Sequence, residues 1–165
     1  MPIKTITHEN VEYPFFQTQG NAAKFIIPFA LEFCSGTGYD IGYNKKEWML
    51  PNATGIDYND GSGYHADNLP DNNVDYIFSS HCLEHVPNWV NTLEYWLTKL
   101  KSGGVLFLYL PDYSQTYWRP WNNKKHKHVL NPDVICDLLR SKGCVKIFKT
   151  GVDLNNSFTI VCEKV

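Results

Sequence analysis

The sequence predicts an α/β fold with a mostly parallel central sheet, helices on both faces and an antiparallel C-terminal edge strand. Strand-like and helix-like segments alternate along most of the chain, which favours parallel strands joined by helices. Residues 105–110 (VLFLYL) form a continuous apolar run, typical of a central parallel strand covered on both faces. The last two strand-like segments follow each other without a helix, which predicts an antiparallel pair at one edge.

The first half of the chain predicts an arm, a helix and three strands. Residues 1–20 read as an irregular arm, and residues 21–165 as a single domain. Asn21 is a candidate helix cap, because apolar residues then recur with helical spacing as far as Phe33, and Pro28 predicts a kink or a restart. Short apolar segments predict strands over 39–42, 53–57 and 74–79.

The second half continues the alternation. Its predicted elements are a helix over 89–100, a strand over 105–110, a helix from 131 and strands over 144–149 and 157–163. Gly103 and Gly104 end the first helix, and Asn131 followed by Pro132 is a favourable start for the second. The connection over 112–130 is too long for a simple turn, so we expect a lid or a binding loop.

Composition limits the function classes. The chain has 165 residues, of which 43% are hydrophobic and 19% charged, enough for one globular core. A formal net charge of −2 argues against nucleic-acid binding, and no segment reads as a membrane span or a secretory signal. The five cysteines are scattered without a metal-type pair, so we expect free, mostly buried thiols and a cytoplasmic protein.

Polar residues that follow strands are the candidate ligand contacts, because open parallel sheets bind ligands beyond the carboxyl ends of their strands. Asp57 can accept two hydrogen bonds from a ribose diol, although a turn or cap aspartate is the structural alternative. Asp67 can accept the amine of adenine while the backbone N–H of Asn68 donates to a ring nitrogen, although Asp-Asn is also common in turns.

The segment SSHCLEHVPNW follows the strand over 74–79. His81 would face the ligand side at the end of that strand. Glu84 near a helix start suits the positive end of the helix dipole, and His85 can be a structural histidine. The spacing of His81 and His85 suits a metal pair on one helical face, but the sequence indicates no third ligand. We therefore predict no metal site.

Together these motifs resemble a known family. The runs DIGYNKKEWMLPNATGIDYND, HADNLPDNNVDYIFSSHCLEHVPNW and LKSGGVLFLYLPD are similar to compact class I S-adenosylmethionine-dependent methyltransferases, often associated with glycan synthesis. The resemblance runs from about Asn21 to Val165, and the LEH and KSGG motifs are its most specific parts. It implies a Rossmann-like methyltransferase fold and S-adenosyl-L-methionine as the cofactor.

The resemblance also implies cofactor roles. Asp40 and Gly42 match the family's D-x-G signature, where the chain turns tightly around the methionine end of the cofactor. The ribose, adenine and methionine contacts follow along the chain. The implied cofactor-binding residues are Asp40, Gly42, Tyr43, Asp57, Tyr58, Asp67, Asn68, Ser80 and His81.

Two departures from the family pattern stand beside this resemblance. Tyr43 and Asn44 occupy the place where the family usually has a second glycine, and the link from Asp40 to Asp57 is short. A rival register uses LEFCSGTG as the glycine loop, with Glu32, Gly36 and Gly38. It would place Pro28 in the central strand, where proline loses a ladder hydrogen bond, so we favour the register of Asp40 and Gly42.

Methyl transfer from a sulfonium is an in-line displacement in which the cofactor carries the chemistry and the protein positions the acceptor. A hydroxyl acceptor also needs a base. His126 is the preferred base, with His81 and Asp112 as the other catalytic candidates; His128 lies on the same loop as His126. That loop carries side chains suited to a sugar ring or an acidic glycan, although a solvated basic loop is the alternative: Tyr113, Tyr117, Trp118, Arg119, Trp121 and Lys124.

The leading function is therefore O-methylation of a saccharide or another small hydroxyl compound. The alternative is a non-catalytic methyltransferase-fold domain that binds the cofactor weakly or acts as an interaction module, which the missing glycine and the short link favour. A nicotinamide-dependent oxidoreductase is unsupported, because no G-x-G-x-x-G follows a first strand. Partners would be a small-molecule or saccharide substrate, with no nucleic acid and no membrane, and dimerisation through the aromatic arm is left open.

Overall fold

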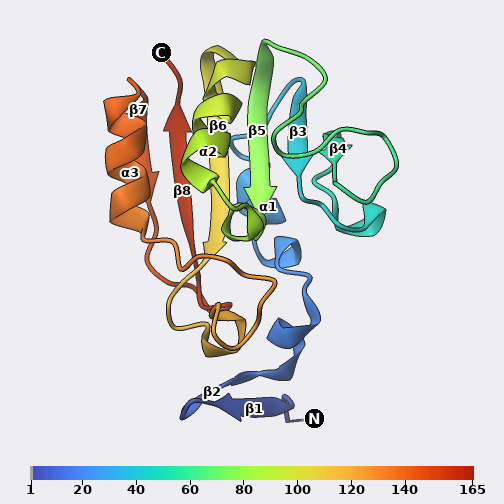
Figure 1. The fold of residues 1–165 in the computed structure, drawn as a ribbon, viewed down its shortest axis with the longest axis vertical. Coiled ribbons are helices and arrows are strands. Elements are labelled where there is room, and N and C mark those ends of the chain that lie inside the picture. The colour runs from blue at the N-terminus through green and yellow to red at the C-terminus, as the bar shows by residue number, and fades with distance from the viewer. Residues whose placement is uncertain (1) are drawn as a thin grey trace.

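A six-stranded sheet forms the centre of the computed structural model, which describes residues 2–165 (Figure 1). Its strand order is β4-β3-β5-β6-β8-β7. The strands are β3 (Gly38–Ile41), β4 (Thr54–Ile56), β5 (Val74–Ser80), β6 (Leu100–Pro111), β7 (Val145–Lys149) and β8 (Ser157–Glu163). The first four of these pair in parallel, whereas β8 runs antiparallel to both β6 and β7. The predicted fold class is confirmed, and β8 inserts between β6 and the outermost strand β7.

Two helices cover one face of the sheet (Figure 1). They are α2 (Trp89–Lys99) and α3 (Pro132–Ser141), and their buried residues share one core with the strands. Trp96 of α2 and Leu139 of α3 are fully buried in this core. The side chain of Asn131 accepts a hydrogen bond from the Asp133 N–H at 2.8 Å, which confirms the predicted helix start.

The other face carries the N-terminal helical segment, η2 (Ala23–Phe25) followed by α1 (Ile27–Ala30). This segment packs on the aromatic side chains of the sheet, including Phe78 and Phe107. Pro28 lies in the first turn of α1, so the predicted restart is confirmed and the helix is far shorter than its apolar pattern suggests. Asn21 caps neither helix, since Ala22 precedes η2 without a side-chain cap bond.

The part of the arm that the structure describes, residues 2–20, is more ordered than predicted. Strands β1 (Thr5–His8) and β2 (Val11–Pro14) form a hairpin, and η1 (Phe15–Gln19) follows. Glu9 and Asn10 turn the hairpin with φ of 49° and 63°, a left-handed turn that carries no glycine to reveal it. The arm docks on its own chain, because the Trp118 ring N–H donates to the Gln17 carbonyl at 2.9 Å.

Two expectations from composition have structural counterparts. The five cysteines are free within the described chain, and all but the half-buried Cys82 are buried. Across residues 2–165, each helix is too short or too polar to cross a lipid bilayer.

Candidate functional site

A cavity of about 840 Å³ lies at the carboxyl ends of β3, β4 and β5. Its wall includes residues 42–44 after β3, residues 57–59 after β4 and residues 80–82 at the end of β5. The N-terminal segment and the loop over 112–130 contribute further lining residues. The volume is that of a pocket for a small molecule or cofactor, at the edge where an open parallel sheet binds ligands.

Gly42 turns the chain at the end of β3. Its φ is +83°, and a Cβ there would lie 2.5 Å from the Cβ of Cys82. Its N–H donates to the Ile56 carbonyl at 2.7 Å, which ties the turn to β4. Asn44 is also left-handed, with φ of 61°. Only glycine combines the left-handed backbone with this close approach, so the backbone itself forms part of the cavity wall.

Asp40 lies just before this turn and is only 1% exposed. Its Oδ2 accepts a hydrogen bond from the Leu50 N–H at 2.7 Å, which anchors the link between β3 and β4. The pKa of Asp40 is raised to about 7, mainly by burial and in part by the charge of Asp57, while the Leu50 N–H acts in the opposite direction. Asp40 therefore supports the site structurally as well as lining the cavity.

Asp57 and Asp67 lie on the wall of the same cavity. Asp57 accepts hydrogen bonds from the Asn59 N–H at 2.9 Å and from the Asn44 N–H at 3.1 Å. Asp67 accepts one from the hydroxyl of Thr92 on α2. Tyr58 is 81% exposed beside them. The structure thus brings together the two carboxylates that the sequence places near successive strands.

Two predicted residues lie elsewhere. The Asn68 N–H donates to the His65 carbonyl at 2.9 Å within a tight turn, so it has no proton left for an adenine nitrogen. Asp112 is absent from the described cavity wall, and its Oδ2 accepts the Ser114 N–H at 2.9 Å. Both residues have a turn role, which for Asn68 is the structural alternative given above. Neither Asn68 nor Asp112 is among the described lining residues of the cavity, and their cofactor and catalytic roles stay predictions.

The structure also decides between the two registers of the glycine loop. Pro28 lies in α1, and Gly36 packs against the side chain of Asp75 in the turn before β3. Glu32 and Gly36 are absent from the cavity wall within residues 2–165, whereas Asp40 and Gly42 belong to it. The chain follows the register of Asp40 and Gly42.

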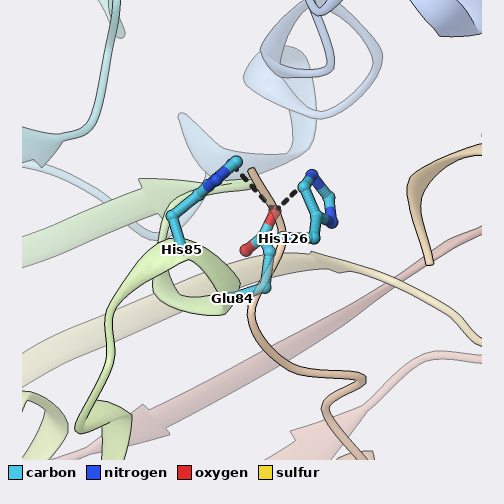
Figure 2. Close-up of side chains that lie close together, drawn as sticks. All are labelled: Glu84, His85 and His126. Carbon is cyan, nitrogen blue, oxygen red and sulfur yellow. Dashed lines mark ion pairs between the residues drawn. The ribbon is translucent and has the colours of Figure 1, made fainter. Parts of the chain in front are cut away.

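Three histidines and one glutamate lie close together at one end of the cavity: His81, His85, His126 and Glu84. Figure 2 shows Glu84, His85 and His126. Glu84 and His85 come from η4 (Leu83–His85), and His126 comes from the loop over 112–130. Glu84 Oε1 lies 3.8 Å from Nε2 of both His85 and His126 and 4.0 Å from Nδ1 of His81. The sequence does not reveal this cluster, because His126 is distant in the chain.

Burial dominates the electrostatics of this cluster. It raises the pKa of Glu84 to about 8 and lowers the pKa of His126 to about 3. It also lowers the pKa of His81 to about 3, with the neighbouring histidines adding to the shift. His81 has φ of 48°, a left-handed backbone at the end of β5 that is uncommon outside glycine. Burial therefore favours the neutral form of these histidines. One ring nitrogen of His81 is hydrogen-bonded to Ser157 Oγ at 2.8 Å, and one of His85 to the Lys125 carbonyl at 2.6 Å.

The loop over 112–130 packs as part of the domain. Trp118 stacks on His126 with ring centroids 5.0 Å apart, and both line the cavity. Arg119 pairs with Glu9 of the arm at 2.5 Å. Among the described lining residues, the predicted sugar-binding side chains are represented by Trp118 alone, so the expected aromatic and cationic platform does not form.

Three side chains of the cavity wall carry no signal in the sequence. Asn21, Gln115 and Asn155 bring side chains from the N-terminal segment, the long loop and the β7–β8 connection. Their positions depend on tertiary contacts between distant segments, and no local motif marks them.

Comparison with known proteins shows the family. A family model described as a methyltransferase domain matches residues 20–147. No curated protein matches the chain in sequence. Several solved structures share the fold. They include a methyltransferase dependent on S-adenosylmethionine from Thermotoga maritima (16% identity, TM-score 0.73, 92% of this chain and 93% of that chain) and one from Archaeoglobus fulgidus (16%, 0.64, 86% and 92%).

A third structure is the N-methyltransferase NodS of Bradyrhizobium japonicum in complex with S-adenosyl-L-homocysteine (13% identity, TM-score 0.61, 91% of this chain and 88% of that chain). The matched residues 20–147 contain the Gly42 turn, Asp57, Asp67 and the histidine cluster. The chain therefore belongs to the methyltransferase domain family and has the Rossmann-like fold of the class I S-adenosylmethionine-dependent methyltransferases.

Proposed function

We propose that this protein transfers the methyl group of S-adenosyl-L-methionine to a hydroxyl of a small molecule, with a neutral saccharide as the favoured acceptor. The observation that carries the proposal is the position of Asp57 and Asp67 on the wall of one cavity that also contains the Gly42 turn. When bound, the cofactor supplies an activated methyl group on its sulfonium.

The residues of the cavity fit this cofactor. The Gly42 turn exposes backbone where a side chain would fill the space. Ser80 Oγ and Asn21 Oδ1 are buried, line the cavity and have no hydrogen-bond partner among the described residues, as expected of groups that meet a polar ligand. The two carboxylates supply acceptors for a ribose diol and an amine.

We assign different parts of the cofactor to different parts of the cavity. Asp57 would accept the ribose hydroxyls, Asp67 the adenine amine, and the exposed ring of Tyr58 would cover the adenine. Gly42 contacts Cys82, the neighbour of His81, so the methionine end of the cofactor belongs between these segments. By holding the cofactor in this way, the cavity would keep the methyl group in place for the acceptor.

His126 and His81 are the groups that we assign to the acceptor's hydroxyl. Both line the cavity, and Trp118 beside His126 offers a flat ring on which a sugar can stack. The amides of Gln115 and Asn155 can hydrogen-bond further hydroxyls. Arg119 is paired with Glu9 and so provides no free cation for an acidic sugar, which leaves Lys125 as the cation of this loop on the cavity wall.

Asp57→Ala is expected to weaken the binding of S-adenosylhomocysteine by at least about 10-fold. Removing a carboxylate that accepts hydroxyl hydrogen bonds costs about 1.5–3 kcal/mol per bond. Isothermal titration calorimetry measures the affinity. Asp137→Ala is the matched control, because Asp137 lies exposed on α3 and pairs only with Arg140 among the described residues. Equal affinity of the wild type and Asp57→Ala would contradict the assigned cofactor site.

The non-catalytic alternative also has a structural observation in its favour. The link between β3 and β4 contains one short 3-10 turn, η3 (Lys46–Trp48), and Tyr43 stands where the family has a glycine. Absence of binding to the wild type at millimolar ligand supports this alternative. Methyl transfer from labelled cofactor to a panel of neutral sugars, acidic sugars and amines supports the enzyme and identifies the acceptor class.

A further inference from the structure

We propose that Glu84, His85 and His126 bind a divalent transition-metal ion of the zinc type at the wall of the cavity. Two histidines and one carboxylate are a donor set that zinc uses in sites with a fourth, open position. His85 and His126 line the cavity, and Glu84 lies behind them. An ion bound here would present its open position to the cavity.

The distances suit ligands of one ion better than a direct hydrogen bond. One ligating atom from each of the three residues lies within 4.8 Å of the others. The two histidine Nε2 atoms are each 3.8 Å from Glu84 Oε1, beyond hydrogen-bond range (Figure 2). Two ligands about 2.1 Å from a tetrahedral zinc ion are about 3.4 Å apart. Small side-chain rotations close that difference.

The hydrogen bond of His85 fixes which nitrogen is free. Its Nδ1 lies 2.6 Å from the Lys125 carbonyl oxygen, which can only accept, so Nδ1 carries the proton of the neutral ring. Nε2 then directs a lone pair toward Glu84. When Glu84 is ionised, two acceptors face each other 3.8 Å apart, an arrangement that a cation between them satisfies. Metal-bound histidines characteristically donate their other N–H to a backbone carbonyl or a carboxylate.

The burial of Glu84 without a hydrogen-bond partner is a second, independent observation that favours a metal ion. Its side chain is 0% exposed, and neither of its oxygens has a hydrogen-bond partner among residues 2–165. A carboxylate in such a position is expected to be paired or to coordinate a metal. A proton on Glu84 is the competing explanation, and the experiment below separates the two.

The fold holds the third ligand in place. The Lys127 N–H donates to the Glu84 carbonyl at 2.9 Å, which fixes the loop over 112–130 to η4, and Trp118 stacks on His126. His81 stands next to the cluster, with Nδ1 4.0 Å from Glu84 Oε1. If the proposed function holds, His126 serves as a metal ligand, the open position orients the acceptor's hydroxyl in the cavity, and His81 is left as the base; that role rests on the proposed function, whereas the binding of the ion does not.

The test is a zinc titration of the chelator-treated full chain, without S-adenosylmethionine. We expect one Zn²⁺ per chain by calorimetry and by elemental mass spectrometry. Cobalt(II) should give the visible absorption of a low-symmetry site. Glu84→Gln should weaken zinc binding by at least about 100-fold. The matched control is Glu94→Gln, because Glu94 lies on the surface of α2 and pairs with Lys142. It should bind zinc like the wild type.

A second variant is available in case Glu84→Gln misfolds. Should Glu84→Gln fail to fold by circular dichroism, His126→Gln takes its place, with His128→Gln on the same loop as its control. Sub-stoichiometric zinc in the wild type, or equal binding by Glu84→Gln and Glu94→Gln, overturns the metal site and leaves a proton on Glu84. Because S-adenosylhomocysteine binding is measured separately in chelator, loss of the metal site and failure of the proposed function give different results.

Discussion

Asp40→Asn is expected to remove most of the loss of stability that the wild type shows between about pH 4 and pH 7. Burial raises the pKa of Asp40 from 3.8 to about 7, so the folded state holds this proton more tightly than the unfolded chain. The stabilisation is complete below about pH 4 and is lost as the pH rises through about 7. It amounts to about 4 kcal/mol over that range.

The substitution keeps the local structure, because an asparagine oxygen can accept the Leu50 N–H as Asp40 Oδ2 does. Urea unfolding of both proteins at pH 4.5 and pH 8 measures the free energy of unfolding. Asp40→Asn should exceed the wild type by about 4 kcal/mol at pH 8 and by only about 1 kcal/mol at pH 4.5. Asp137→Asn, on the exposed surface of α3, should keep the wild-type pH dependence. Parallel pH profiles for the wild type and Asp40→Asn would show that Asp40 ionises normally.

Gly42→Ala is expected to reduce the free energy of unfolding by about 2–5 kcal/mol and to weaken the binding of S-adenosylhomocysteine. A left-handed φ of +83° costs a residue with a Cβ about 1–2 kcal/mol. The new methyl group would also lie 2.5 Å from the Cβ of Cys82, and such overpacking costs about 1–3 kcal/mol more. Relief of the clash would move the chain segment that approaches the cofactor.

Gly143→Ala separates the two contributions. Gly143 has φ of +82° at the end of α3, but nothing lies within 4 Å of its added Cβ. Its substitution should therefore show the backbone contribution alone and leave ligand binding unchanged. Denaturant unfolding and calorimetry on both variants measure this. A loss of stability in Gly42→Ala no larger than in Gly143→Ala would mean that the close approach to Cys82 is unimportant.

Most of the sheet could be predicted because its signals are local. The apolar run over 105–110 lies in β6, a central strand buried on both faces, and the Asn131-Pro132 pair begins α3 as expected. The arm could not be predicted in the same way. Its hairpin turns at Glu9 and Asn10 without a glycine, and its docking depends on contacts with Trp118 far along the chain.

The candidate site likewise combines residues that the sequence predicts with residues that only tertiary packing brings there. Asp57 and Gly42 follow strands, so the topology of a parallel sheet brings them to one edge. The sequence favours a Glu84 that interacts with the positive end of a helix dipole. The helix begins later, at Trp89, and Glu84 instead lies buried in a 3-10 turn. The third member of its cluster, His126, arrives through tertiary packing of the long loop. Proximity of this kind cannot be read from spacing along the sequence.

A crystal structure with S-adenosylhomocysteine tests the central assignment most directly. We expect the ribose hydroxyls within hydrogen-bond distance of Asp57, the adenine beside Tyr58 and Asp67, and the sulfur next to the Gly42 turn, facing the histidine cluster. Ligand density away from Asp57, or an empty cavity in crystals soaked at saturating ligand, would contradict it.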